Sequence, residues 1–101
     1  MKNIANEIIE WHRGTFPNAT EKAILLKLTE ESEELIKAIE NDTNIIEEIA
    51  DVVIVAVAFL ARRRLWLEDV VSTKLDINKS RKWGDEDENG DRPRVKMIEA
   101  D

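Results

Sequence analysis

Apolar residues recur at helical spacing in residues 18–39. Four of them fall on one face of such a helix: Leu25, Leu28, Leu35 and Ile39. Asn18 precedes the segment and Glu21 follows three residues later, which is the spacing of a capping box. We therefore expect a helix that begins at Asn18, ends near Ile39 and packs through its apolar face.

The segment 44–64 predicts a second helix, because Asn44 and Glu47 repeat the capping pattern. Residues 52–57 are rich in β-branched side chains and taken alone would suit a buried strand. The run continues a capped, acidic turn, however, and is longer than an ordinary strand. The connection through residues 41–44 is short, so the two helices should lie antiparallel.

The remaining segments predict an all-α helical bundle. Residues 4–11 suggest a short helix or turn, residues 12–18 a loop, and residues 67–82 a third long helix. We expect one helical domain over residues 1–84 and a C-terminal tail over residues 85–101. The second helix is apolar nearly all round, and so small a domain has few elements to cover it. A homodimer or homotetramer should complete the core.

Composition narrows the possible functions. The 101 residues include no Cys and carry a formal net charge of −7, which excludes disulfides and thiolate chemistry and argues against nonspecific binding to nucleic acid. Residues 1–10 contain no apolar signal core. The apolar run 52–61 is about half the ~20 residues that a membrane span needs. We expect a cytoplasmic protein with no membrane partner.

Carboxylates are concentrated around the connection between the first two long helices. Within 30–51 the only basic residue is Lys37. Glu31 and Glu34 lie about 60° apart on one helical stripe, as do Glu48 and Asp51, and both pairs border apolar positions. Antiparallel packing would make the pairs face each other. Such a group repels itself unless it takes up protons or hard cations, and all-oxygen ligands favour Mg²⁺ or Mn²⁺.

Three other patterns could account for acidic residues of this chain. A solvated helix face suits Glu33 and Glu40. A di-iron bundle requires Glu-x-x-His on two helices, and the chain has a single histidine, His12. Residues 85–90 imitate the start of an EF-hand loop, but Lys96 stands where a bidentate glutamate is needed.

Basic residues form two groups. Arg62, Arg63 and Arg64 end the second long helix, where cations offset the helix dipole. Arg62 also lies near the helical angle of Asp51 and so points along the acidic stripe. Three polar residues share one face of the third long helix and could hold a polyphosphate: Lys74, Asn78 and Arg81.

Two blocks, Lys27 to Leu35 and Glu47 to Val52, resemble the EExxE…ExxD signature of the all-α nucleoside triphosphate pyrophosphohydrolases, the MazG-like and dimeric dUTPase superfamily. The flanks at residues 11–17 and 74–83 are similar to the dATP/dGTP diphosphohydrolase branch, which includes the phage MazZ-type enzymes. Leu65 departs from the pattern, because a glycine is expected to end the helix there.

The resemblance implies hydrolysis of a purine deoxynucleoside triphosphate, dGTP or dATP, to the monophosphate and pyrophosphate, in the host cytoplasm if the protein is phage-encoded. Mg²⁺, with Mn²⁺ as a substitute, would be held by Glu31, Glu34, Glu48 and Asp51. Glu34 would orient or deprotonate the attacking water, with Glu30 supporting it. Phosphate would be bound by Lys27, Lys74, Asn78 and Arg81. The candidates for binding the base are the aromatic residues Trp11, His12, Phe16 and Trp83.

Two further hypotheses stay open. The chain could be a non-catalytic helical interaction module, whose acids are solvated, or a nucleotide-binding sensor without hydrolytic activity. The preferred base, the attacked phosphorus and the number of metal ions are not determined by the sequence.

Overall fold

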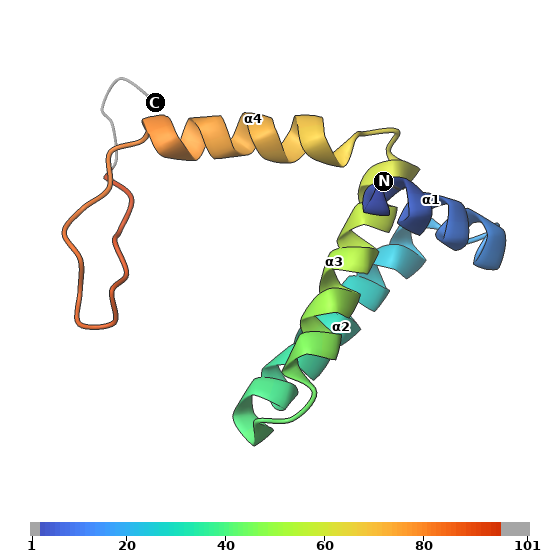
Figure 1. The fold of residues 1–101 in the computed structure, drawn as a ribbon, viewed down its shortest axis with the longest axis horizontal. Coiled ribbons are helices and arrows are strands. Elements are labelled where there is room, and N and C mark those ends of the chain that lie inside the picture. Colours follow the sequence, from blue (N-terminus) through green and yellow to red (C-terminus); the bar gives the residue numbers. More distant parts are fainter. Residues whose placement is uncertain (1–2, 96–101) are drawn as a thin grey trace. The chain divides into compact units, whose positions relative to one another are not determined.

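The computed structural model describes residues 3–95 and contains four helices in that range: α1 (Ile4–Thr15), α2 (Glu21–Asn41), α3 (Ile45–Arg62) and α4 (Leu67–Ser80) (Figure 1). No strand occurs among these residues, where Trp83 and Arg94 form an isolated β-bridge. The predicted all-α fold is confirmed.

Helices α2 and α3 lie side by side and antiparallel, as their short connection predicted (Figure 1). Asp42 ends α2 in the left-handed conformation, with φ 53°, and its N–H donates to the last turn of the helix. The N–H of Thr43 donates to the carbonyl of Ala38 at 3.0 Å, so the turn satisfies carbonyls that the helix end leaves free. This tight turn holds the two helices together at one end.

The predicted helix starts need correction. Asn18 does not cap α2. It lies in a turn in which the Ala19 N–H donates to the Phe16 carbonyl, so the helix begins later in the chain. Thr20 is the N-cap residue, and its side chain accepts from the Ala23 N–H at 3.1 Å. Asn44 does precede α3, but it adopts a left-handed φ of 53° and its side chain makes no capping hydrogen bond. The capping boxes predicted at both helices are therefore wrong, although the helices are present.

Helix α1 is longer than predicted. It continues through Gly14 to Thr15, and the N–H of Phe16 donates to the His12 carbonyl at 2.7 Å. The loop expected over residues 12–18 is therefore reduced to the few residues between α1 and α2. As a result, His12 lies on a helix, one turn before Phe16.

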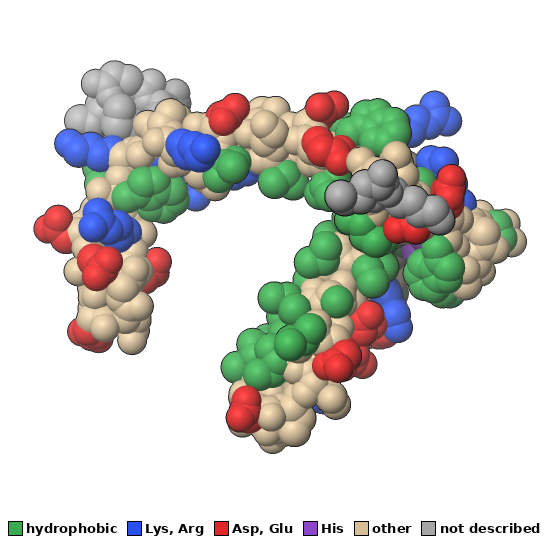
Figure 2. Space-filling view, viewed as in Figure 1, with side chains coloured by type: hydrophobic (Ala, Val, Ile, Leu, Met, Phe, Trp, Pro, Cys, Tyr) green, Lys and Arg blue, Asp and Glu red, His purple; other side chains and the backbone are tan. Residues whose placement is uncertain are grey.

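The buried core of the described chain is small. Its hydrophobic members are Ala5, Ile24, Ala38, Val57 and Ala58. Along α3 a stripe of large apolar side chains is exposed: Ile46 (80%), Ile49 (51%) and Val53 (52%). Figure 2 shows apolar side chains running along the α2–α3 pair beside a row of acids. Within the described residues 3–95 this stripe stays exposed, and the expected oligomer stays a prediction.

The chain divides into two compact units, and the boundary follows Leu67. In the second unit, α4 ends at Ser80, two residues before the predicted Lys82. The segment that follows folds back on itself, with the Gly84 N–H donating to the Pro93 carbonyl at 2.7 Å. The division into a domain over residues 1–84 and a tail over 85–101 stays a prediction, and residues 96–101 lie outside the described residues.

Among the described helices, none combines the length and the apolar character that crossing a membrane demands.

Candidate functional site

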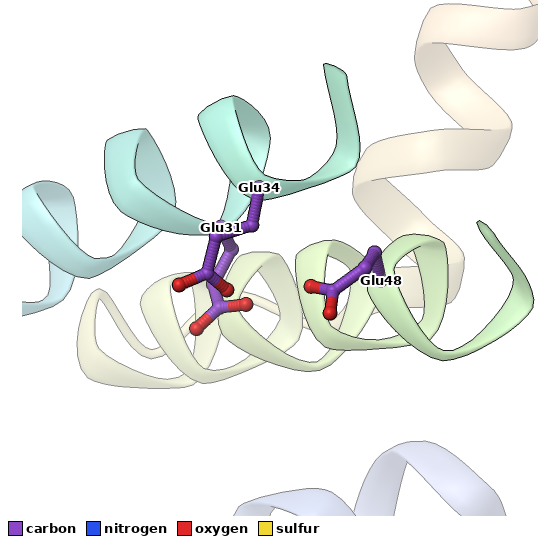
Figure 3. A group of neighbouring side chains, drawn as sticks. All are labelled: Glu31, Glu34 and Glu48. Atoms are coloured by element: carbon purple, nitrogen blue, oxygen red, sulfur yellow. The ribbon is translucent and has the colours of Figure 1, made fainter. Parts of the chain in front are cut away.

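Three carboxylates converge where α2 and α3 face each other near their connecting turn. Glu31 and Glu34 come from adjacent turns of α2, and Glu48 comes from the first turn of α3. One oxygen of each lies within 4.8 Å of the others (Figure 3). The antiparallel hairpin therefore brings together acids from both predicted pairs.

The cluster has the donor set of a cation site. Glu31 is only 6% exposed, and the Oε2 atoms of Glu31 and Glu48 are buried without a hydrogen-bond partner among the described residues. Burial raises the pKa of Glu31, and the nearby charges of Glu34 and Asp51 raise it further. Such unpaired buried oxygens lose solvation that a bound cation would replace. The residues present fit a hard divalent ion with oxygen ligands.

Lys27 partly compensates the negative charge of the acidic cluster. Its Nζ lies 3.3 Å from Oε1 of Glu31 and 3.7 Å from Oε2 of Glu30. The ion pair with Glu31 opposes the rise in the pKa of that carboxyl and raises the pKa of Lys27 itself. Glu30 is exposed and reaches the cluster through Lys27.

Asp51 lies one turn after Glu48 on α3 and is not among the three acids whose oxygens converge. It is close enough for its charge to raise the pKa of Glu31. Together with Glu31 and Lys27, it lines a cavity of about 380 Å³. Asp51 therefore connects the acidic cluster with this neighbouring cavity.

Part of the lining of the cavity is aromatic. Trp11, His12 and Phe16 all line it. The rings of Trp11 and Phe16 pack edge to face with their centroids 5.7 Å apart, and those of His12 and Phe16 lie 5.1 Å apart. Burial lowers the pKa of His12, which favours the neutral imidazole. We name this space the aromatic cavity; it offers flat surfaces beside the carboxylates.

The aromatic cavity also has apolar lining residues that were not anticipated from the sequence. Ala23 and Ile24 of α2 and Ile54 and Val55 of α3 line it. The sequence could have indicated Ile54 and Val55, because they follow Asp51 by three and four residues and therefore lie on the same helix face. Ala23 and Ile24 of α2 show no comparable pattern in the sequence.

Four of the predicted site residues lie in the second unit. Arg81 Nη1 contacts Asn78 Oδ1 at 3.4 Å, and the indole N–H of Trp83 donates to the Asn78 carbonyl at 2.9 Å. Lys74 lies one turn before Asn78 on α4. The residues Lys74, Asn78 and Arg81 are thus grouped with Trp83, while their action on a ligand stays a prediction.

Known proteins share both the sequence pattern and the fold. The model of the MazG nucleotide pyrophosphohydrolase domain matches residues 19–82. Among solved structures, the chain is similar to the cyanophage S-2L MazG-like pyrophosphohydrolase bound to dGDP and three catalytic Mn²⁺ ions per active site. That likeness has a TM-score of 0.72 and 27% identity, and it covers 92% of this chain and 94% of the other. No curated protein matches the chain.

The matched segment contains the whole α2–α3 hairpin and α4, and thus every carboxylate of the cluster. The fold, the acidic cluster and the family match agree. The chain belongs to the MazG family of nucleotide pyrophosphohydrolases and is a nucleoside triphosphate pyrophosphohydrolase.

Proposed function

We propose that the chain hydrolyses a purine deoxynucleoside triphosphate, dGTP or dATP, to the monophosphate and pyrophosphate. The observation that carries this proposal is the convergence of Glu31, Glu34 and Glu48 beside the aromatic cavity. A purine is the larger flat base and suits the aromatic lining of this cavity. The similar cyanophage enzyme was solved with dGDP, which supports a purine deoxynucleotide as substrate.

Glu31, Glu34, Glu48 and Asp51 would hold the metal, with Mg²⁺ as the usual ion and Mn²⁺ as a substitute. Oxygen donors suit both ions, and the similar cyanophage enzyme carries Mn²⁺. When bound, such an ion supplies charge neutralisation at phosphate oxygens and a lowered pKa for water.

The chain's own acids and bases have separate roles in this proposal. Glu34 is exposed at the edge of the cluster, where its carboxylate can accept the proton of an attacking water. Glu30 acts through Lys27, because its ion pair keeps that ammonium beside the cluster. Lys27 lines the aromatic cavity and can donate to a phosphate oxygen.

Roles for the other predicted site residues follow from their chemistry. Trp11, His12 and Phe16 would hold the base in the aromatic cavity. Lys74, Asn78 and Arg81 would stabilise the charge that develops on the leaving pyrophosphate. Trp83, which is 40% exposed, is a further candidate for stacking on the base.

A homodimer or homotetramer is part of the proposal. The exposed stripe formed by Ile46, Ile49 and Val53 is a continuous apolar face of α3, and in water such a face favours burial against a copy of itself. Sedimentation of the wild-type chain should give a dimer or tetramer. Replacement of Ile49 by Glu should shift it toward the monomer.

The decisive experiment measures pyrophosphate release from all four deoxynucleoside triphosphates with Mg²⁺, with Mn²⁺ and with EDTA. We expect release from dGTP or dATP with either metal and none with EDTA. Wild-type inactivity on every triphosphate would contradict the proposal. Nucleotide binding without release would instead identify a sensor, and indifference to both nucleotide and metal would identify an interaction module.

A further inference from the structure

A second cavity lies between α1 and the C-terminal end of α3, and its charged side chains are all basic. It has a volume of about 300 Å³ and is lined by Arg13, Arg62 and Arg64 together with His12. No Asp or Glu is among its described lining residues, although the chain contains 22 acids. We name it the arginine cavity.

The three arginines of this cavity form no ion pair of 4.0 Å or less with any residue in the described part of the chain. Arg63, which lies between two of them, behaves differently: it pairs with Glu21 and does not line the cavity. Arg62 is close enough to Glu21 for its charge to help lower the pKa of that carboxyl. Three guanidinium groups still border one cavity that has no acid among its lining residues, which makes the cavity positively charged. The partial charge at the end of α3, about half a negative unit, is too small to neutralise it.

Arg64 also occupies a backbone position that usually selects glycine. It has φ 60°, and the hydrogen bonds Arg64 N–H to Ala61 and Leu65 N–H to Leu60 form the usual C-terminal cap of a helix. The residue expected to be glycine from the sequence was Leu65, so the position is shifted by one. An arginine side chain is present here despite the conformational cost of a left-handed residue.

Two planar rings, those of His12 and Phe16, are among the other residues that line the arginine cavity. His12, Phe16 and Ile24 line it and also line the aromatic cavity, so the two cavities share a wall. Guanidinium groups bind phosphate through paired N–H donors, and rings contact planar groups. Both features match a phosphomonoester that carries a flat ring.

We propose that the arginine cavity binds a nucleoside monophosphate, with the phosphate on Arg13, Arg62 and Arg64, at a site separate from the carboxylate cluster. The proposal goes beyond the hydrolysis of a triphosphate and does not depend on it. Without metal, the carboxylates repel a phosphate. Binding of a monophosphate in EDTA therefore reports on the arginines.

The test is calorimetric titration of the full chain with dGMP in EDTA at low salt. We expect saturable binding by the wild type. The dissociation constant should be at least tenfold higher in Arg13→Gln and in Arg64→Gln. The matched control is Arg63→Gln, which removes the same charge at the same helix end and should stay within twofold of the wild type. Melting curves check that each variant is folded.

Three results would overturn the proposal: no saturable binding by the folded wild type, an equal loss in Arg63→Gln, or equal affinity for deoxyguanosine, which lacks the phosphate. Inorganic phosphate that competes as well as dGMP would show a simple anion site and overturn the nucleotide assignment. Pyrophosphate release is assayed separately. An inactive wild type that still binds dGMP through its arginines would contradict the proposed hydrolysis and leave the arginine cavity supported.

Discussion

The ammonium group of Lys27 lies 3.3 Å from Oε1 of Glu31, while Oε2 of the same carboxylate is buried without a hydrogen-bond partner among the described residues. One oxygen is therefore compensated and the other is not. Lys27→Met should raise the pKa of Glu31 further in the metal-free protein, because it removes the one contact that lowers it. Carboxyl ¹³C NMR titration in EDTA measures this pKa. Lys22→Met is the control, and an unchanged pKa in Lys27→Met would contradict the expectation.

Metal binding should stabilise the fold through the acidic cluster. Addition of Mn²⁺ at about 100 times its dissociation constant should add about 2.7 kcal/mol to the free energy of unfolding of the wild type. Glu48→Gln should lose most of this gain, because Glu48 contributes a buried, unpartnered oxygen. Glu47→Gln, on the neighbouring exposed position, is the matched control. Thermal melts with Mn²⁺ and with EDTA compare the three proteins, and an equal gain in all of them would remove Glu48 from the site.

The stability of the metal-free protein should depend on pH through Glu31. The pKa of Glu31 is raised in the folded chain, so its protonated form favours folding at and below its ordinary value of 4.5. This contribution is lost as the pH rises from 4.5 through the raised value. Urea unfolding in EDTA should therefore show a decline over that window in the wild type and a smaller one in Glu31→Gln. Identical pH profiles would contradict the assignment.

Arg64→Gly should separate stability from ligand binding. Glycine adopts the left-handed conformation of this position without the steric cost, which is about 1 kcal/mol or more for other residues. The variant should unfold at higher urea concentration than the wild type, yet bind dGMP in EDTA more weakly. A variant that is less stable would show that the arginine side chain contributes more to the fold than its backbone conformation costs.

Phe16→Ala should raise the KM for the preferred triphosphate about tenfold, equivalent to about 1.4 kcal/mol of binding energy. Phe16 lines the aromatic cavity and contacts the rings of both Trp11 and His12. Trp66→Ala removes an exposed aromatic side chain that does not line this cavity and serves as the control. Steady-state kinetics with both variants provide the comparison, and an equal KM for them would contradict a role of Phe16 in base binding.

Helical periodicity was enough to predict α2, which has an apolar stripe. The segment of α3 is apolar nearly all round, and it was predicted to be a helix from its acidic first turn and its length. The short turn also predicted that two pairs of acids, Glu31 with Glu34 and Glu48 with Asp51, would face each other. Glu31, Glu34 and Glu48 do converge, whereas Asp51 is not among the acids whose oxygens meet. The caps were harder, because several short polar residues compete for the same N–H groups, and Thr20 is used in place of Asn18.

The cavities could not be predicted in the same way. They depend on how α1 packs on α3, which involves residues far apart in sequence. Gly14 and Pro17 suggested a loop, so the continuation of α1 through His12 was missed. A role of Trp11, His12 and Phe16 in base binding was expected only from the family resemblance, and the arginine cavity was not expected at all.

The turn at Asp42 and Asn44 has a consequence for how the protein forms. The acids of the cluster come from one hairpin, so few residues must be ordered before they meet, and the entropy lost in closing so short a segment is small. Low contact order of this kind favours rapid folding. A lengthened turn would cost little in chain entropy, but it would release the register that holds oxygens of α2 opposite those of α3.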